Sequence, residues 1–181
     1  MFFTNSFILT AFTLVTLAGA TPVAPETLCK GNQVITSTQY IGAEKNVKMD
    51  LITCDDISKA PGSLLQPRQA ASVCGATCTT HCFTPSGGGP DPNDCHIIAD
   101  ALRFNSQNIA PVFQIGNGTS NIVSLSFSSC TSFFLNQAST PLNYCRTDFA
   151  NVIDFVAPNC QATQNAHGGL CLADDGRWFI Q

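Results

Sequence analysis

The amino-acid sequence predicts an α+β sandwich in which two main helices pack on a mostly antiparallel sheet of about five strands. Two segments repeat apolar residues at helical spacing, which indicates amphipathic helices. Several shorter segments alternate apolar and polar residues, as half-buried strands do. The 181 residues also include 10 cysteines, which indicates a small fold stabilised by disulfide bonds.

Both predicted helices have recognisable ends. The first begins at Pro92, after the N-cap residue Asp91, and continues to about Phe104. The second runs from Thr147 to Val156, because Pro158-Asn159 stops the helical pattern. The apolar stripes are Ile97, Ile98, Ala101 and Leu102 in the first helix, and Phe149, Val152, Ile153 and Val156 in the second.

Strands are predicted on both sides of the first helix. Asn117-Gly118 and Asp175-Gly176 are turn sequences of the hairpin kind, so each is expected to join two adjacent strands. Two strands precede the first helix, and the five that follow it form the expected sheet. The predicted strands cover residues 33–40, 46–53, 111–115, 123–127, 131–136, 170–173 and 177–181.

The first 20 residues are expected to be a signal peptide. Residues 7–17 are apolar, and Ala18-Gly19-Ala20 has the small-residue pattern of a cleavage site. The apolar run is too short to span a bilayer and no later stretch is long enough, so no membrane insertion is expected. The chain is therefore predicted to be secreted and extracellular.

Residues 21–68 are expected to form a unit of their own, a β-hairpin closed by a Cys29–Cys54 bridge. Two interpretations stay open: removal after Arg68 as a pro-segment, or retention as a small N-terminal lobe. Residues 69–181 form the domain proper, and its cysteines can pair among themselves with a connectivity that the sequence does not give. They are Cys74, Cys78, Cys82, Cys95, Cys130, Cys145, Cys160 and Cys171.

Composition and motifs exclude several functions. A net charge of −4 with 11% charged residues disfavours nucleic acid as a partner. The segment CGATCTTHC, which contains His81, superficially resembles a zinc cluster, but disulfides are expected in a secreted chain, so no metal or other cofactor is predicted. The common hydrolase and nucleotide-binding motifs are missing, and Asp148 and Asp154 fall on different helix faces. His96, in the first turn of a helix, is expected to be neutral and structural. The chain is therefore not expected to be an enzyme.

The loop QNAHGG and its surroundings are the most function-like part of the sequence. A sugar site needs planar polar groups for hydroxyls and an aromatic face for stacking. Asn165 and His167 supply polar groups, and the glycines that follow allow the backbone to approach a ligand closely. Trp178 offers an aromatic face, although packing in the core explains it as well. Separately, Asn117 begins an N-glycosylation sequence.

The domain from about residue 74 onward resembles the small secreted glycan-binding proteins of mushrooms. The resemblance rests on the cysteine cluster, on DPNDC at the first helix, on YCRTDFANVIDFVAPNCQATQNAHGG and on CLADDGRWFIQ. It implies an α/β/α-type sandwich, homodimers, and binding of glycans that contain GalNAc or GlcNAc, with or without fucose. It also implies that the partners are glycans or glycoproteins.

The resemblance does not transfer individual ligand contacts, so the roles of single residues are hypotheses drawn from their chemistry. Arg146, Asn165 and His167 would bond hydroxyl or acetamido groups, and Asp148 would orient Arg146. Tyr144 or Trp178 would supply the stacking face. The alternative is a cysteine-rich secreted effector, like a killer toxin, that acts on a protein target, because fold alone does not fix function.

Overall fold

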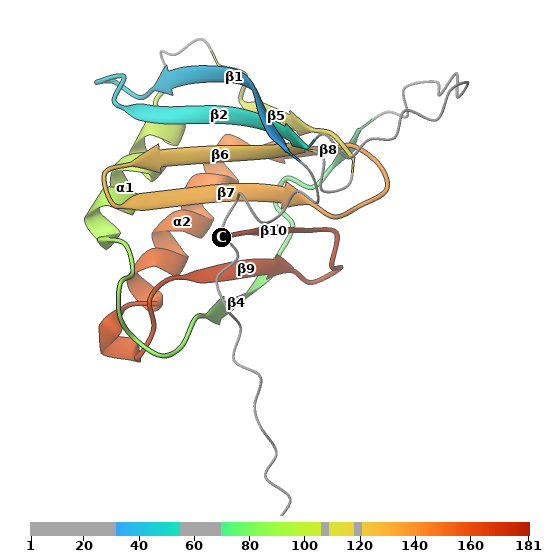
Figure 1. The fold of residues 1–181 in the computed structure, drawn as a ribbon. Helices are drawn as coiled ribbons and strands as arrows, with labels where there is room; N and C mark the ends of the chain where they lie inside the picture. The colour runs from blue at the N-terminus through green and yellow to red at the C-terminus, as the bar shows by residue number, and fades with distance from the viewer. Residues whose placement is uncertain (1–31, 55–69, 106–108, 118–120) are drawn as a thin grey trace, which may run out of the picture.

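A computed structural model describes residues 32–54, 70–105, 109–117 and 121–181. The predicted signal peptide, Cys29 and Arg68 lie outside these ranges. Within them, the chain folds into two α-helices, a short 3-10 helix and ten strands (Figure 1). None of the helices in the described part is both long and apolar enough to cross a bilayer.

The main sheet has seven strands rather than about five. They are β1 (Gln33–Ile41), β2 (Val47–Cys54), β4 (Cys78–Cys82), β6 (Asn121–Phe127), β7 (Cys130–Asn136), β9 (Gly169–Ala173) and β10 (Trp178–Ile180). Their order is β1-β2-β6-β7-β10-β9-β4, and every neighbouring pair is antiparallel. The predicted hairpin between β9 and β10 is confirmed.

A second, small sheet corrects one predicted turn. Its strands are β3 (Ala71–Ser72), β5 (Val112–Ile115) and β8 (Leu142–Cys145), in the order β3-β8-β5. Because β5 pairs with β8 and β6 pairs with β2 and β7, the chain changes sheets after Asn117. The hairpin predicted at Asn117-Gly118 is therefore wrong, since a local turn sequence does not decide which distant strand pairs with β5.

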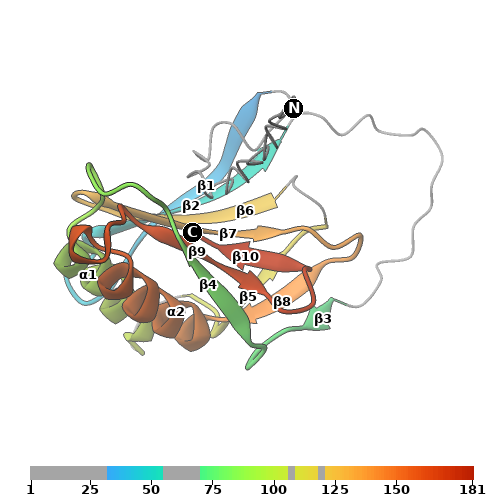
Figure 2. The same cartoon turned by 90° about the horizontal axis from the view of Figure 1, so that it is seen from below.

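The two helices are close to their predicted positions but lie on one face of the main sheet (Figure 2). Helix α1 (Pro92–Arg103) begins where Asp91 accepts a hydrogen bond from the Asn93 N–H. Helix α2 (Arg146–Asn159) starts one residue earlier than predicted and includes Pro158 in its last turn. Their shared face gives two layers, so the expected α/β/α arrangement is wrong, whereas the α+β class is confirmed.

The hairpin β1–β2 is part of the main sheet and not a separate lobe. β2 pairs with β6 over six residues, and Ile41, Val47 and Met49 are buried in the same core as α1 and β7. Gly42 lies so close to α1 that an added Cβ would be 2.9 Å from the Ala101 Cβ. Residues 21–68 and residues 69–181 each contain an even number of cysteines, which suggested two independent units. The apolar side of the hairpin, however, needs the rest of the domain for its burial.

Aromatic side chains fill the centre of the core. The Trp178 and Phe134 rings stack with centroids 5.4 Å apart, and Tyr144 lies 4.9 Å from Trp178. Phe149 from α2 contacts Phe134 and Tyr144 edge-on. Such offset and edge contacts add stability beyond the burial of area. The cluster joins both sheets to α2.

The predicted disulfides are confirmed for the domain proper, and their connectivity is now defined. The four pairs have sequence separations of 35 to 93 residues. Cys54 is also disulfide-bonded, and its expected partner Cys29 lies outside the described residues. The four pairs are Cys74–Cys145, Cys78–Cys171, Cys82–Cys160 and Cys95–Cys130.

Candidate functional site

Two loops lie side by side at one end of the sandwich. Residues 84–90 connect β4 to α1, and residues 161–168 connect α2 to β9. The bond between Cys82 and Cys160 ties the loops together where they leave β4 and α2. We call residues 84–90 and 161–168 the loop pair. Figure 1 shows both loops at the lower left.

Backbone contacts hold the loop pair in one arrangement. Phe83 donates its N–H to the Gly168 carbonyl (2.9 Å) and accepts the His167 N–H (3.0 Å). Gly168 donates to the Cys160 carbonyl at 2.9 Å. At Gly89, an added Cβ would lie 2.8 Å from the His167 backbone, so only glycine allows the loops to approach this closely.

Asn165 and His167 are brought together, as predicted, and each contacts the opposite loop. The Asn165 Oδ1 accepts a hydrogen bond from the Ser86 N–H at 3.4 Å. The His167 Nδ1 faces the Pro85 carbonyl, which can only accept, so Nδ1 carries the proton. In neutral His167, Nε2 is then an acceptor, while the Asn165 amide keeps its two N–H donors. Asn165 also adopts a left-handed conformation (φ 56°), which asparagine tolerates better than most residues.

Two hollows meet at His167. On one side, the glycines of the first loop, together with Gln161 and Ala162, line a groove of about 240 Å³. On the other, a cavity of about 120 Å³ reaches between the helices and the sheet, with mostly apolar walls. Pro90 and His167 line both. The arrangement suits a ligand that has a polar part and a small apolar group. The apolar walls include Phe83, Ile153, Val156, Ala157 and Ile180.

Tyr144 and Trp178 cannot be the stacking face of a sugar site. Trp178 is 0% exposed and Tyr144 is 1% exposed, so neither ring offers a free face to a ligand. Burial also raises the pKa of the Tyr144 hydroxyl. The core-packing interpretation of Trp178 is correct, and Tyr144 shares it. In sequence, a large aromatic beside a polar loop has the same appearance in either role.

Arg146 and Asp148 lie at the other end of α2 from the loop pair. Since α2 has 14 residues, the two ends are roughly 20 Å apart. Arg146 is only 7% exposed and donates to the Phe104 carbonyl at 3.2 Å, and burial lowers its pKa. Asp148 accepts the Gly75 N–H at 2.7 Å, a contact that does not involve Arg146. The predicted pair is therefore not part of one site with Asn165 and His167.

One group of side chains near Asp148 has the spacing of metal ligands. Ligand atoms of Cys74, Cys145 and Asp148 lie within 4.8 Å of one another. The two sulfurs are bonded to each other, so neither is a thiolate that could bind a metal. No metal site follows from this group.

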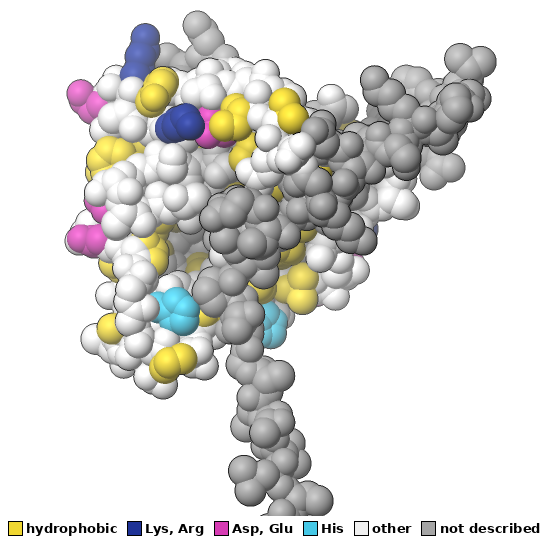
Figure 3. All heavy atoms as spheres, in the orientation of Figure 1, with side chains coloured by type: hydrophobic (Ala, Val, Ile, Leu, Met, Phe, Trp, Pro, Cys, Tyr) yellow, Lys and Arg dark blue, Asp and Glu magenta, His cyan; other side chains and the backbone are white. Residues whose placement is uncertain are grey.

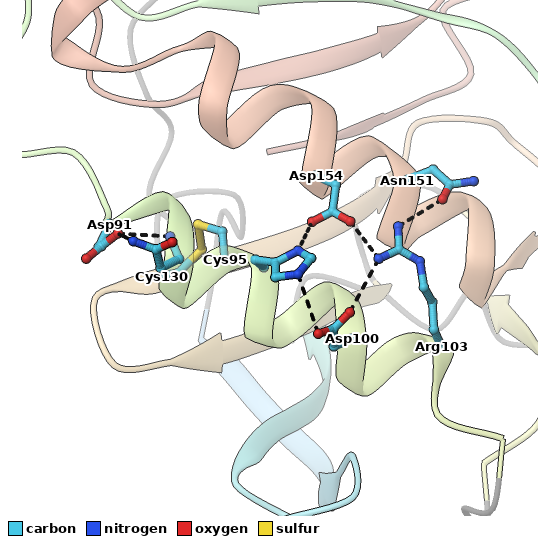
Figure 4. Close-up of polar contacts among 9 residues, drawn as sticks. Asp91, Cys95, Asp100, Arg103, Cys130, Asn151 and Asp154 are labelled. Carbon is cyan, nitrogen blue, oxygen red and sulfur yellow. Dashed lines mark hydrogen bonds and ion pairs between the residues drawn. A yellow bond between two sulfur atoms is a disulfide. The ribbon is translucent and has the colours of Figure 1, made fainter.

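A charged cluster joins the outer surfaces of α1 and α2, and the sequence did not reveal it (Figure 4). The Asp154 carboxylate contacts two side chains of α1, the His96 Nδ1 at 2.8 Å and the Arg103 Nη1 at 2.6 Å. Asp100 lies 3.5 Å from the other ring nitrogen of His96, and Arg103 also donates to Asn151 at 3.0 Å. The hydrogen bond to Asp154 raises the pKa of His96 and so favours the protonated ring, a contact that the prediction of a neutral histidine did not include.

The contribution of His96 to stability is expected to disappear as the pH rises. The pKa of His96 in the folded protein lies above the ordinary value of 6.5. The contribution of His96 to stability is therefore complete below about pH 6.5 and is lost as the pH rises through the folded-state pKa. Because the side chain is 57% exposed, His96→Ala should cost only about 0.3–1 kcal/mol at about pH 5.5, and less at about pH 8.5. Urea unfolding at both pH values measures this. His81→Ala, on the exposed surface of β4, is the control, and an equal loss at both pH values would contradict the assignment.

Figure 3 shows few charged side chains where grey atoms do not cover the face of the main sheet away from the helices, and histidines are visible low in this view. Asn117 is exposed, but Gly118 and Thr119 of its glycosylation sequence lie outside the described residues, so the modification stays a prediction. Of the predicted glycan-binding residues, Asn165 and His167 are the two that belong to the loop pair. No protein-family model, no curated protein and no solved structure matches this chain.

Proposed function

We propose that this protein is an extracellular carbohydrate-binding protein whose ligand site is the loop pair. The observation that carries the proposal is the pairing of Asn165 and His167. Each is fixed by a backbone group of the opposite loop, through Ser86 N–H or the Pro85 carbonyl. The amide N–H groups of Asn165 and the His167 Nε2 remain as a donor and an acceptor, the combination that a hydroxyl or acetamido group requires.

The hollows beside His167 support glycans that contain GalNAc or GlcNAc, with or without fucose. The apolar cavity has room for a methyl group such as that of an N-acetyl substituent, and the Pro90 ring offers apolar contact where Tyr144 and Trp178 cannot. The glycine-lined groove would receive the hydroxyl-bearing part. The four disulfides agree with an extracellular compartment.

A glycan array with the full, oxidised chain tests the proposal. Wild-type protein should bind N-acetylhexosamine glycans, and Asn165→Ala or His167→Ala should each weaken binding about tenfold or more, because about 1.4 kcal/mol corresponds to a factor of ten. Gly89→Ala should also weaken binding, since it pushes the loops apart. Ser86→Ala is the matched control, because it keeps the backbone N–H that bonds Asn165. Absence of binding to every glycan would refute the function, and full binding by both Asn165→Ala and His167→Ala would refute the site.

A second candidate is an effector that acts on a protein target. The observation that favours it is the exposed apolar side chains on the outer surface of the helices, where Phe155 is 58% exposed and Ile97 is partly exposed. They neighbour Asp154 and His96 in sequence, at the cluster that joins the helices. If the protein acts on a protein target through this surface, Phe155→Asp is expected to abolish binding to that target, whereas His167→Ala is not. Glycan recognition predicts the reverse.

A further inference from the structure

We infer that β1 is a self-association edge, at which a second copy of this chain adds its own β1 antiparallel and extends the sheet. β1 is an end strand of the seven-stranded order, with no strand on its outer side among the described residues (Figure 1). An edge strand presents a row of backbone N–H and C=O groups that can pair with another strand. The kind of partner that fits is set by the side chains of β1.

β1 has a bulge, but it lacks the length limit, charges and prolines that also protect edge strands from pairing. Its nine residues, QVITSTQYI, contain no charged residue and no proline, whereas protected edges are short or carry lysine or proline. The opposite edge, β4, is five residues long, and disulfides at Cys78 and Cys82 attach it to the neighbouring structure. The two edges of the sheet therefore differ, and within the described residues β1 is the long, uncharged edge with no further strand beside it.

The side chains of β1 that are exposed include large apolar ones. Ile35 is 52% exposed and Tyr40 is 59% exposed. Their partners on β2 are Ile52 and Lys48, which lie on the face away from the helices because Val47 and Met49 face the core. Ile35 and Tyr40 therefore share one face of the sheet, on either side of Thr38, which pairs with Asp50.

The sequence of β1 matches itself when two copies run antiparallel about Thr38. The strand has a bulge between Ile35 and Ser37, so Thr36 is left out of the count. Thr38 then lies opposite Thr38 of the second copy, and Gln39 lies opposite Ser37. Ile35 of each copy lies opposite Tyr40 of the other, on the same face. An aromatic residue opposite a β-branched residue is a favourable cross-strand pair, and the two-fold axis makes it twice.

The charges near this axis are already balanced within one copy. Asp50 is paired with Lys48 at 2.7 Å and accepts the Thr38 hydroxyl at 2.6 Å. Two copies can therefore approach without an unpaired like charge, which favours a second copy over a charged partner. The loop pair leads into β9, near the opposite edge of the sheet, so self-association is independent of the ligand site.

Sedimentation velocity of the full chain tests the inference. Wild type is expected to dimerise with a Kd on the order of 10 µM, since a single-strand edge gives a small interface. Ile35→Lys and Tyr40→Lys should each raise the Kd at least about tenfold by placing a charge in the interface. Phe155→Lys, an equally exposed change on α2, is the matched control and should leave the dimer intact. Wild type that stays monomeric at about 200 µM, or a dimer unaffected by both β1 variants, would overturn it.

A cysteine variant tests the register in the same experiment. Directly opposite residues have Cα atoms about 4.5–5.5 Å apart, within the range of a disulfide. Thr38→Cys should therefore give a covalent dimer on oxidation, whereas Gln39→Cys, which would face Ser37, should not. Cross-linking by neither, or equally by both, contradicts pairing about Thr38.

Discussion

A Trp178→Ala chain is expected to lose about 3–5 kcal/mol of the free energy of unfolding. The indole is fully buried, stacks on the Phe134 ring and also contacts the Tyr144 ring. Alanine at this position would therefore leave a cavity where the two sheets and α2 meet. Since the change removes the only tryptophan, guanidinium unfolding should be followed by far-UV circular dichroism. The same chain, where folded, should bind glycans like wild type.

Two companions make the result specific. Trp178→Phe should cost much less, because the ring remains and the indole N–H, which has no hydrogen-bond partner among the described residues, is removed. Phe155→Ala, a change of similar size on the exposed surface, should alter stability by about 0.5 kcal/mol or less. If Trp178→Ala kept wild-type stability and lost glycan binding, Trp178 would belong to the ligand site.

A chain that starts at residue 69 is expected not to fold cooperatively. It would lack Ile41, Val47 and Met49, which are buried in the main core. Burying one such side chain contributes roughly 1.5–3 kcal/mol. Three of them therefore correspond to roughly 5–9 kcal/mol, against about 5–15 kcal/mol for a whole domain. The loss would also leave the β6 edge unpaired and prone to aggregation. A thermal melt monitored by circular dichroism measures this, and a sharp transition in the shortened chain would contradict it.

Cleavage after Arg68 in the folded protein gives a different expected outcome. The eight cysteines of the domain proper pair among themselves, so they would not retain the hairpin covalently. The pairing of β2 with β6 should still hold it, and the two pieces should copurify until denaturant is added. Val47→Asp should weaken this retention, and Gln39→Asp, on the exposed strand β1, should not. Removal of the segment in the cell remains a prediction.

Much of the fold followed from local patterns. The caps and apolar spacing of both helices located them to within a few residues, because capping and amphipathicity act within one helix. Three strands were not predicted. β3 has only two residues, and the segments CTTHC of β4 and LNYC of β8 show no clear alternation of apolar and polar residues. The place of β1 and β2 beside β6 depends on contacts between distant segments, which local patterns do not encode.

The candidate site was predictable only where it is contiguous. Asn165 and His167 stand two residues apart, so one loop carries both. The first loop, with Pro85 and Gly89, is about 80 residues away in sequence, and no local pattern links it to Asn165 and His167. The bond between His96 and Asp154 spans 58 residues and joins two helices, so it needs the helix packing to be known.

The disulfide bond between Cys82 and Cys160 determines when, and in which compartment, the proposed ligand site can form. Both loops start at this bond, so the facing arrangement of Asn165 and His167 depends on it. A newly made chain in a reducing compartment would have the same residues without the restraint. On the proposed function, competence to bind glycans would then be acquired only after oxidation, and the reducing interior of the producing cell would hold only the form that lacks this restraint.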